Sequence, residues 1–135
     1  MNPRIVRSSS GLKKFNIKSI AIVTDEALIV SVLGGEKPHV GAVAISIPRP
    51  SLKDPKKLSS STSVLTLLGH KEDELAKPIA ELLVKELKRT TVVSIGIHVE
   101  SASEEDIEKL IENSMKSVKI LIKKIKAISI EGHSF

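Results

Sequence analysis

The chain has 135 residues and a formal net charge of +5, a length that suits one domain with its own hydrophobic core. It contains no cysteine, which excludes disulfides, a thiolate nucleophile and cysteine-ligated zinc or iron–sulfur centres. Phe15 and Phe135 are its only aromatic residues, so we expect neither stacking platforms for single-stranded nucleic acid nor an aromatic sandwich around a planar cofactor. No apolar run reaches the roughly 20 residues of a membrane span, and the N-terminus lacks the apolar segment of a secretory signal. We therefore expect a cytoplasmic protein that binds neither nucleic acid nor membrane, with a Lys-, Glu- and Ile-rich composition typical of thermophiles.

The N-terminal third of the chain predicts a polar arm followed by two strands. Residues 1–11 are polar and predict a flexible N-terminal arm. Leu12–Thr24 alternates between apolar and polar residues with a shift of phase near Ser19, which predicts a bulge or two short strands. Ala27–Leu33 is rich in β-branched residues and predicts a strand that is buried on both faces. The glycine pair that begins at Gly34 ends it.

Three further strands are expected in the rest of the chain. They are His39–Ile47, Ser59–Leu68 and Thr90–Val99, the first two separated by a proline-rich loop. The first of them has small residues that predict the close approach of another group, namely Gly41, Ala42, Ala44 and Ser46.

Two helices are expected from apolar residues at helical spacing. The first spans Glu74–Lys88, and Pro78 favours a regular start near Leu75–Lys77 after an irregular turn. The second begins after Ser103, the N-cap of a sequence that resembles a capping box, and ends near Lys126. Residues 127–135 form a C-terminal tail, which could add an edge strand or stay loose.

The element order ββββαβα predicts an α+β fold, a two-layer sandwich with a mixed five-stranded sheet and both helices on one face. Residues 12–126 would form this single domain. The fourth and fifth strands flank a helical crossover and should run parallel, so that His70 and His98 share one edge of the sheet. An antiparallel third strand would place His39 at the same edge.

This edge is the candidate functional site predicted from the topology. It would hold three histidines, three glutamates (Glu36, Glu72 and Glu100) and both helix N-termini. A metal site of His39, His70, His98 and Glu72 would suit Zn, Mn, Ni or Fe, and would favour a metal-dependent enzyme acting on a small anionic substrate. The alternative interpretation is that each histidine is a polar surface residue at the end of a strand.

Three stretches, PHVGAVAISIPRPS, SVLTLLGHKEDELAKPIAELL and VSIGIHVESASEEDIEKLIEN, resemble the small D-type subunit found with UbiD-type hydroxyarylic acid decarboxylases, the prenylated flavin chaperone family. The resemblance covers about residues 34–113. It implies a non-catalytic or barely catalytic protein that binds prenylated FMN. The motif residues that correspond here are His39, Gly41, Gly69, His70, Lys71 and His98.

The resemblance also implies partners. The protein would deliver or protect prenylated FMN between a flavin prenyltransferase and a UbiD-type apo-decarboxylase. The small side chains around Gly41, Ala42 and Ala44 would leave room for a flat ring, and a divalent metal could bridge the phosphate. A purely structural subunit of a decarboxylase is the remaining alternative. The sheet face without helices predicts a homodimer or a larger homo-oligomer.

Overall fold

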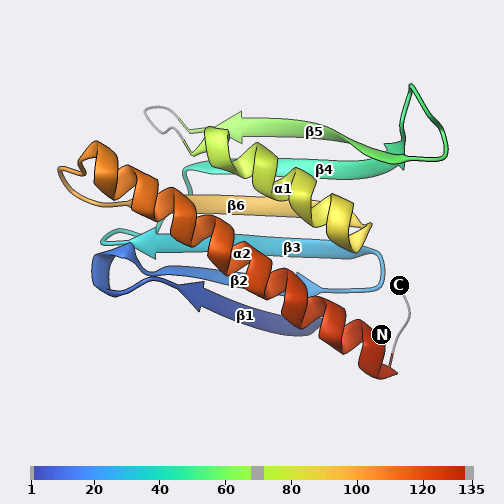
Figure 1. The fold of residues 1–135 in the computed structure, drawn as a ribbon, viewed down its shortest axis with the longest axis horizontal. Coiled ribbons are helices and arrows are strands. Elements are labelled where there is room, and N and C mark those ends of the chain that lie inside the picture. Colours follow the sequence, from blue (N-terminus) through green and yellow to red (C-terminus); the bar gives the residue numbers. More distant parts are fainter. Residues whose placement is uncertain (1, 68–71, 133–135) are drawn as a thin grey trace.

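A computed structural model describes residues 2–67 and 72–132 of the chain. In this part of the chain, two α-helices and a mixed six-stranded sheet form an α+β fold (Figure 1). In chain order the elements are β1 (Arg4–Ser10), the 3-10 turn η1 (Lys13–Phe15), β2 (Ile17–Val23), β3 (Ala27–Gly35), β4 (Ala42–Pro50), β5 (Leu58–Thr66), α1 (Asp73–Leu87), β6 (Thr90–His98) and α2 (Glu104–Gly132).

The strands lie in the order β1-β2-β3-β6-β4-β5. β1, β2 and β3 form an antiparallel meander, and β3 pairs with β6 in parallel. β4 is antiparallel to both β6 and β5, so β5 and β6 run in the same direction. The ends of β3, β5 and β6 therefore lie at the same edge as the start of β4, which is the arrangement that the helical crossover predicted.

The N-terminal residues correct two of the sequence-based predictions. Arg4–Ser10 forms the edge strand β1, paired along its length with β2, so the expected flexible arm is wrong for these residues and the sheet has six strands instead of five. Leu12–Thr24 is not one long strand, because η1 precedes β2, and β2 pairs without a bulge. The apparent shift of phase arises because β2 has apolar side chains on both faces: Ile17 is buried, whereas Ile22 is exposed.

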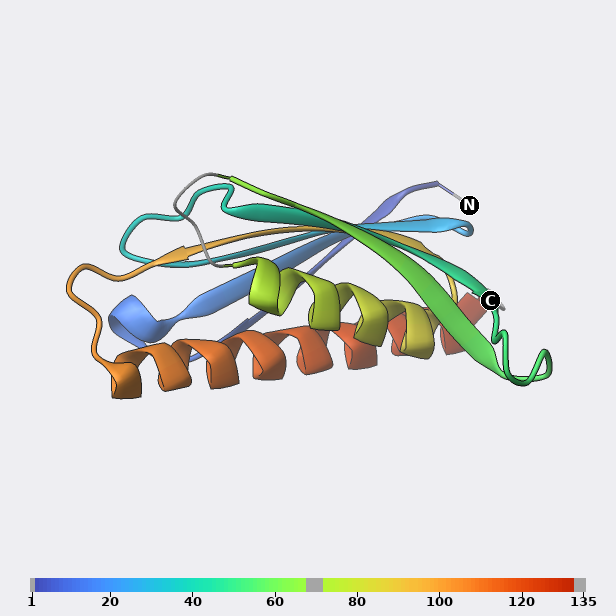
Figure 2. The same cartoon turned by 90° about the horizontal axis from the view of Figure 1, so that it is seen from above.

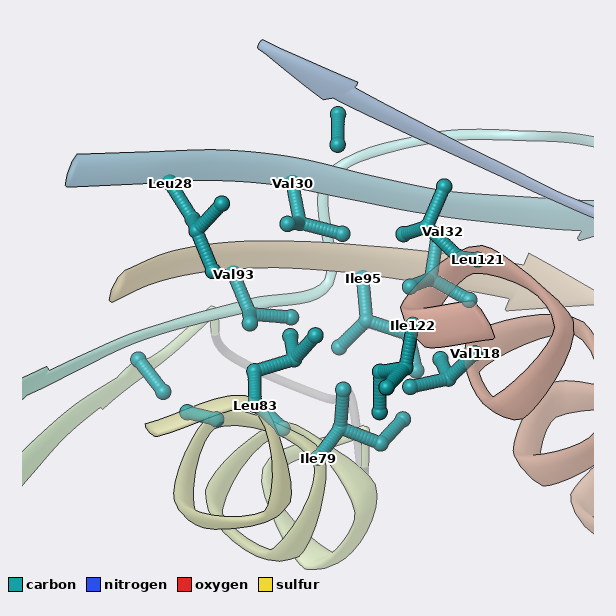
Figure 3. Packing of buried hydrophobic residues seen from close by; sticks show 14 of the residues in the cluster. Leu28, Val30, Val32, Ile79, Leu83, Val93, Ile95, Val118, Leu121 and Ile122 are labelled. Atoms are coloured by element: carbon teal, nitrogen blue, oxygen red, sulfur yellow. The ribbon is translucent and has the colours of Figure 1, made fainter. Parts of the chain in front are cut away.

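Both helices cover the same face of the sheet (Figure 2). α1 packs on β4, β5 and β6, and α2 packs on β1 and β2. Between helices and sheet lies one aliphatic core, in which side chains of β3 and β6 meet those of both helices, as Figure 3 shows for Val30, Val93, Ile79 and Leu121. Burying each such side chain stabilises the fold by about 1.5–3 kcal/mol relative to exposure, so these contacts fix both helices on the sheet.

The helix boundaries differ from the sequence-based predictions at two points. α1 begins at Asp73, before the expected Leu75–Lys77, and contains Pro78. α2 continues to Gly132, so the first part of the expected C-terminal tail is helical. The predicted capping box at the start of α2 is confirmed, since the Ser103 hydroxyl accepts from Asp106 N–H and the Asp106 carboxylate accepts from Ser103 N–H, both at 3.1 Å.

Three serine hydroxyls form a buried hydrogen-bonded group between α2, β1 and β2. The Ser8 hydroxyl donates to the Ser117 carbonyl oxygen at 2.7 Å and lies 3.2 Å from the Ser117 hydroxyl. The Ser19 hydroxyl is 2.8 Å from the same Ser117 hydroxyl. The helix thus contacts both strands through polar groups as well as apolar ones.

Within residues 2–67 and 72–132, no helix lies on the opposite face of the sheet (Figure 2). β3 alternates between buried residues such as Val30 and exposed ones such as Ile29, so the prediction that this strand is buried on both faces is wrong. In β4 the small residues Ala42 and Ala44 face the helices, whereas Ile45 is exposed on the other side. Among the described helices, none is long and apolar enough to span a membrane.

Candidate functional site

The structure brings His39 and His98 together at one end of the sheet, as the strand directions predicted. His98 is the last residue of β6 and is paired with Gly35 at the end of β3, whereas His39 lies just before β4. The two imidazole rings approach edge to face, with their centroids 6.5 Å apart and an interplanar angle of 75°. We call this region the histidine end.

The first histidine forms a half-buried ion pair with Glu72, which we call the inner pair. Nε2 of His39 lies 3.0 Å from Oε1 of Glu72, and the exposed fractions of the two side chains are 24% and 11%. Nδ1 of His39 lies 2.8 Å from the Lys37 carbonyl oxygen. Because both ring nitrogens face oxygen acceptors, only the doubly protonated ring can donate to both.

Two glycines make the inner pair sterically possible. A Cβ on Gly41 would lie 2.5 Å from the carboxyl carbon of Glu72, so a larger residue here would displace this carboxylate from its observed position. A Cβ on Gly96 would lie 1.5 Å from the backbone oxygen of His39. Gly41 is also fixed by its backbone, since its N–H donates to Ile95 and its carbonyl oxygen accepts from Leu67, each at 2.9 Å. The space beside these two glycines is therefore filled by other parts of the same chain, the Glu72 carboxylate and the His39 backbone.

The second histidine forms an exposed ion pair, which we call the outer pair. Nε2 of His98 lies 3.0 Å from Oε2 of Glu100, and their side chains are 46% and 67% exposed. Nζ of Lys37, which is 72% exposed, lies 3.5 Å from the same oxygen. The hydrogen bond from His98, and then the charge of Lys37, lower the pKa of Glu100 below its ordinary value.

Backbone hydrogen bonds join the loops that carry these groups. The Glu36 N–H donates to the His98 carbonyl oxygen at 2.7 Å, and the Glu100 N–H donates to the Glu36 carboxylate at 2.8 Å. The turn after β3 and the turn after β6 are therefore held together. Lys37 is placed beside His98 and Glu100 by this connection, with its ammonium group exposed.

The remaining predicted site residues have different fates. Gly69, His70 and Lys71 lie outside the described residues. Ala42 is fully buried in the core beneath α1, so the open small-residue surface expected for a flat ring is absent there. Among residues 2–67 and 72–132, no group of three or more His, Asp or Glu side chains could hold a metal ion, so the proposed metal site has no support from its described members.

Sequence reasoning missed Lys37 and Gly96. A glycine inside a β-branched strand is itself a signal for close backbone approach, and Gly96 meets the His39 carbonyl in that way. Lys37 carries no such signal, because a lysine in a loop is ordinarily solvated. Its position depends on the turn after β3, which only the structure shows.

Comparisons with known proteins address the fold and the family. A chain in the crystal structure of a novel chaperone complex for yeast 20S proteasome assembly is similar in fold, with a TM-score of 0.60 and 14% sequence identity, over 94% of this chain and 98% of that chain. No curated protein matches this sequence significantly. A family model described as the prenylated flavin chaperone LpdD-like domain matches residues 11–126, most of the length, and the chain therefore belongs to this family.

Proposed function

We propose that this protein binds prenylated FMN at the histidine end and carries it to a UbiD-type apo-decarboxylase. The observation that carries the proposal is the family match over residues 11–126, because the family is one of prenylated flavin chaperones. The flavin prenyltransferase would supply the cofactor. The chemistry of the histidine end supports this assignment.

The donors at the histidine end fit a phosphomonoester. The phosphate of an FMN-type cofactor is a dianion that binds well to lysine and to imidazolium. Lys37 and His98 are both accessible to solvent. Glu100, which forms ion pairs with both of them, is itself exposed. Surface ion pairs contribute little stability, so a phosphate could replace the carboxylate at small cost.

The inner pair would have a different part in binding. His39 and Glu72 are shielded from solvent and paired with each other through one carboxylate oxygen, so we assign them to positioning. They fix the start of α1 against the loop before β4, next to the outer pair. This arrangement would keep the position of His98 constant while Glu100 is exchanged for the ligand.

If Glu100 and the phosphate compete for the same donors, the direction of each affinity change can be predicted. In anaerobic titrations of the purified protein with prenylated FMN, followed by absorbance, His98→Ala should weaken binding about tenfold, because a hydrogen bond to a charged group is lost. Glu100→Gln should tighten binding, because the competing charge is removed. Lys57→Ala is the matched control: it removes a cation just before β5, at the opposite end of the sheet, and should leave the affinity unchanged.

Two further outcomes decide the proposal. If the wild-type protein binds neither prenylated nor unmodified FMN, the proposed function is wrong. If it binds prenylated FMN but neither His98→Ala nor Glu100→Gln changes the affinity, the cofactor is held elsewhere. Delivery is measured separately, as the rate at which an apo-decarboxylase gains activity from the loaded protein compared with free cofactor at the same concentration.

A further inference from the structure

The sheet face without helices carries a continuous row of aliphatic side chains. Strand register places Ile5 opposite Ile22, Ile22 opposite Ile29, and Ile29 opposite Val92, which in turn lies opposite Ile45. These five side chains, here called the aliphatic row, come from β1, β2, β3, β6 and β4. Four of them are exposed and Val92 is half-buried.

Further exposed aliphatic side chains lie next to the aliphatic row and widen the apolar surface. Exposed Ile47 adjoins it in β4, and exposed Leu65 lies one row away in β5. Each of the four exposed isoleucines is a β-branched residue in a strand that already buries its other face. Contiguous aliphatic surface of this kind marks an interaction site, because a partner that covers it removes apolar area from water, which is favourable.

We propose that a second copy of this chain covers the open face, with aliphatic row against aliphatic row. Six strands spaced about 4.8 Å apart, each of seven to nine residues with a rise of about 3.3 Å, give a face of roughly 700 Å². A standard stable interface buries about 800 Å² per partner. The face is thus large enough for a specific dimer, and an identical sheet has the matching twist for face-to-face packing.

Polar side chains lie at the two margins of the open face. Arg7 and Lys18 lie beside the row at the β1–β2 margin and, with Lys124, line a hollow of about 450 Å³. At the other margin the open face of β5 carries the hydroxyls of Ser61 and Ser63, opposite Ile47 and Ile45. An apolar centre with a polar margin is the usual anatomy of a protein interface, and no charged side chain interrupts the row itself.

The test compares two isoleucines of equal exposure. Ile45, in the row, is 40% exposed, and Ile111, on α2, is 41% exposed. By sedimentation equilibrium the wild-type protein should be a dimer at micromolar concentration. Ile45→Lys should weaken dimerisation at least a hundredfold while the circular dichroism spectrum is unchanged, and Ile111→Lys should remain a dimer. A monomeric wild type, or dissociation of the Ile111→Lys variant instead, would overturn the proposal.

Cross-linking tests the same interface without disturbing the row by a charge. Because the chain contains no cysteine, a single introduced thiol is unique. Ile29→Cys, at the middle of the row, should give a covalent dimer with a short bifunctional thiol reagent. Glu112→Cys, exposed on α2, should not. The reverse pattern would place the interface on the helical layer and contradict the proposal. Neither experiment involves flavin, so failure here leaves the proposed function untouched.

Discussion

The histidine end contains two histidine–glutamate pairs with the same separation and different surroundings. In both, Nε2 of the imidazole lies 3.0 Å from a carboxylate oxygen. Glu72 of the inner pair is 11% exposed, whereas Glu100 of the outer pair is 67% exposed. The inner pair is enclosed by glycine-lined backbone, and the outer pair lies in solvent and shares its carboxylate with Lys37.

Equal distance therefore does not mean equal energy. Solvent and salt screen the outer pair, so that its members can exchange partners at little cost. The inner pair is shielded, and losing one member would leave the other without its main partner in a poorly solvated place. The comparison indicates that the inner pair holds its position, whereas the members of the outer pair are available to bind a ligand.

The largest effect on stability is expected from Gly96→Ala, which disturbs the backbone of His39 and so displaces the inner pair. The new Cβ would lie 1.5 Å from the His39 carbonyl oxygen, and both β6 and the loop before β4 would have to move. We expect the free energy of unfolding to fall by about 3 kcal/mol or more, measured by urea denaturation. Ser94→Ala, two residues earlier in β6, is the control and should change it by less than about 0.5 kcal/mol. A loss below about 1 kcal/mol for Gly96→Ala would show that this contact is easily relieved.

A smaller effect is expected from breaking the inner pair directly. A double-mutant cycle of His39→Ala and Glu72→Ala should give a coupling energy of about 1–2 kcal/mol. The same cycle on His98 and Glu100 should give a clearly smaller coupling energy, because solvent and salt screen this exposed pair. Equal coupling energies in the two cycles would contradict the distinction between the pairs.

The smallest effect concerns the titration of Glu100. Its pKa is lowered, first by the hydrogen bond from His98, so the carboxyl ¹³C signal should titrate below the ordinary value. His98→Ala should move the midpoint upward. For a lowered pKa the contribution to stability is present above the unfolded-state value and is lost as the pH falls through the folded-state value. Because Glu100 is exposed, we expect that loss only in acid and without a measurable change in melting temperature at neutral pH. A midpoint unchanged in His98→Ala would refute the role of the imidazole.

Much of the fold could be predicted from the sequence, because periodicity and connectivity are local properties. The crossover between β5 and β6 determined which strand ends meet, and the Ser103 capping box marked the start of α2. The strand β1 was missed because a run of serines reads as a loop. In the fold, Ser8 is satisfied by Ser117, 109 residues away, which no local pattern reveals.

The candidate site was predictable in position and less so in detail. Strand direction alone brought His39 and His98 to one end. The small residues in and just before β4 did signal close approach. The Glu72 carboxylate approaches Gly41, and α1 packs on the alanines of β4 in the core. Likewise, the larger residue Ile45 faces outward, a choice that hydrophobicity by itself does not predict.

The buried serine hydroxyls also determine the position of α2 along its own axis. An amphipathic helix of 29 residues could slide by one turn along an aliphatic surface and still bury a similar area. At any other position the hydroxyls of Ser8, Ser19 and Ser117 would be buried without partners, at a cost of about 1–3 kcal/mol for each group. The serine hydrogen bonds thus favour one position of the helix over other positions that would bury a similar apolar area.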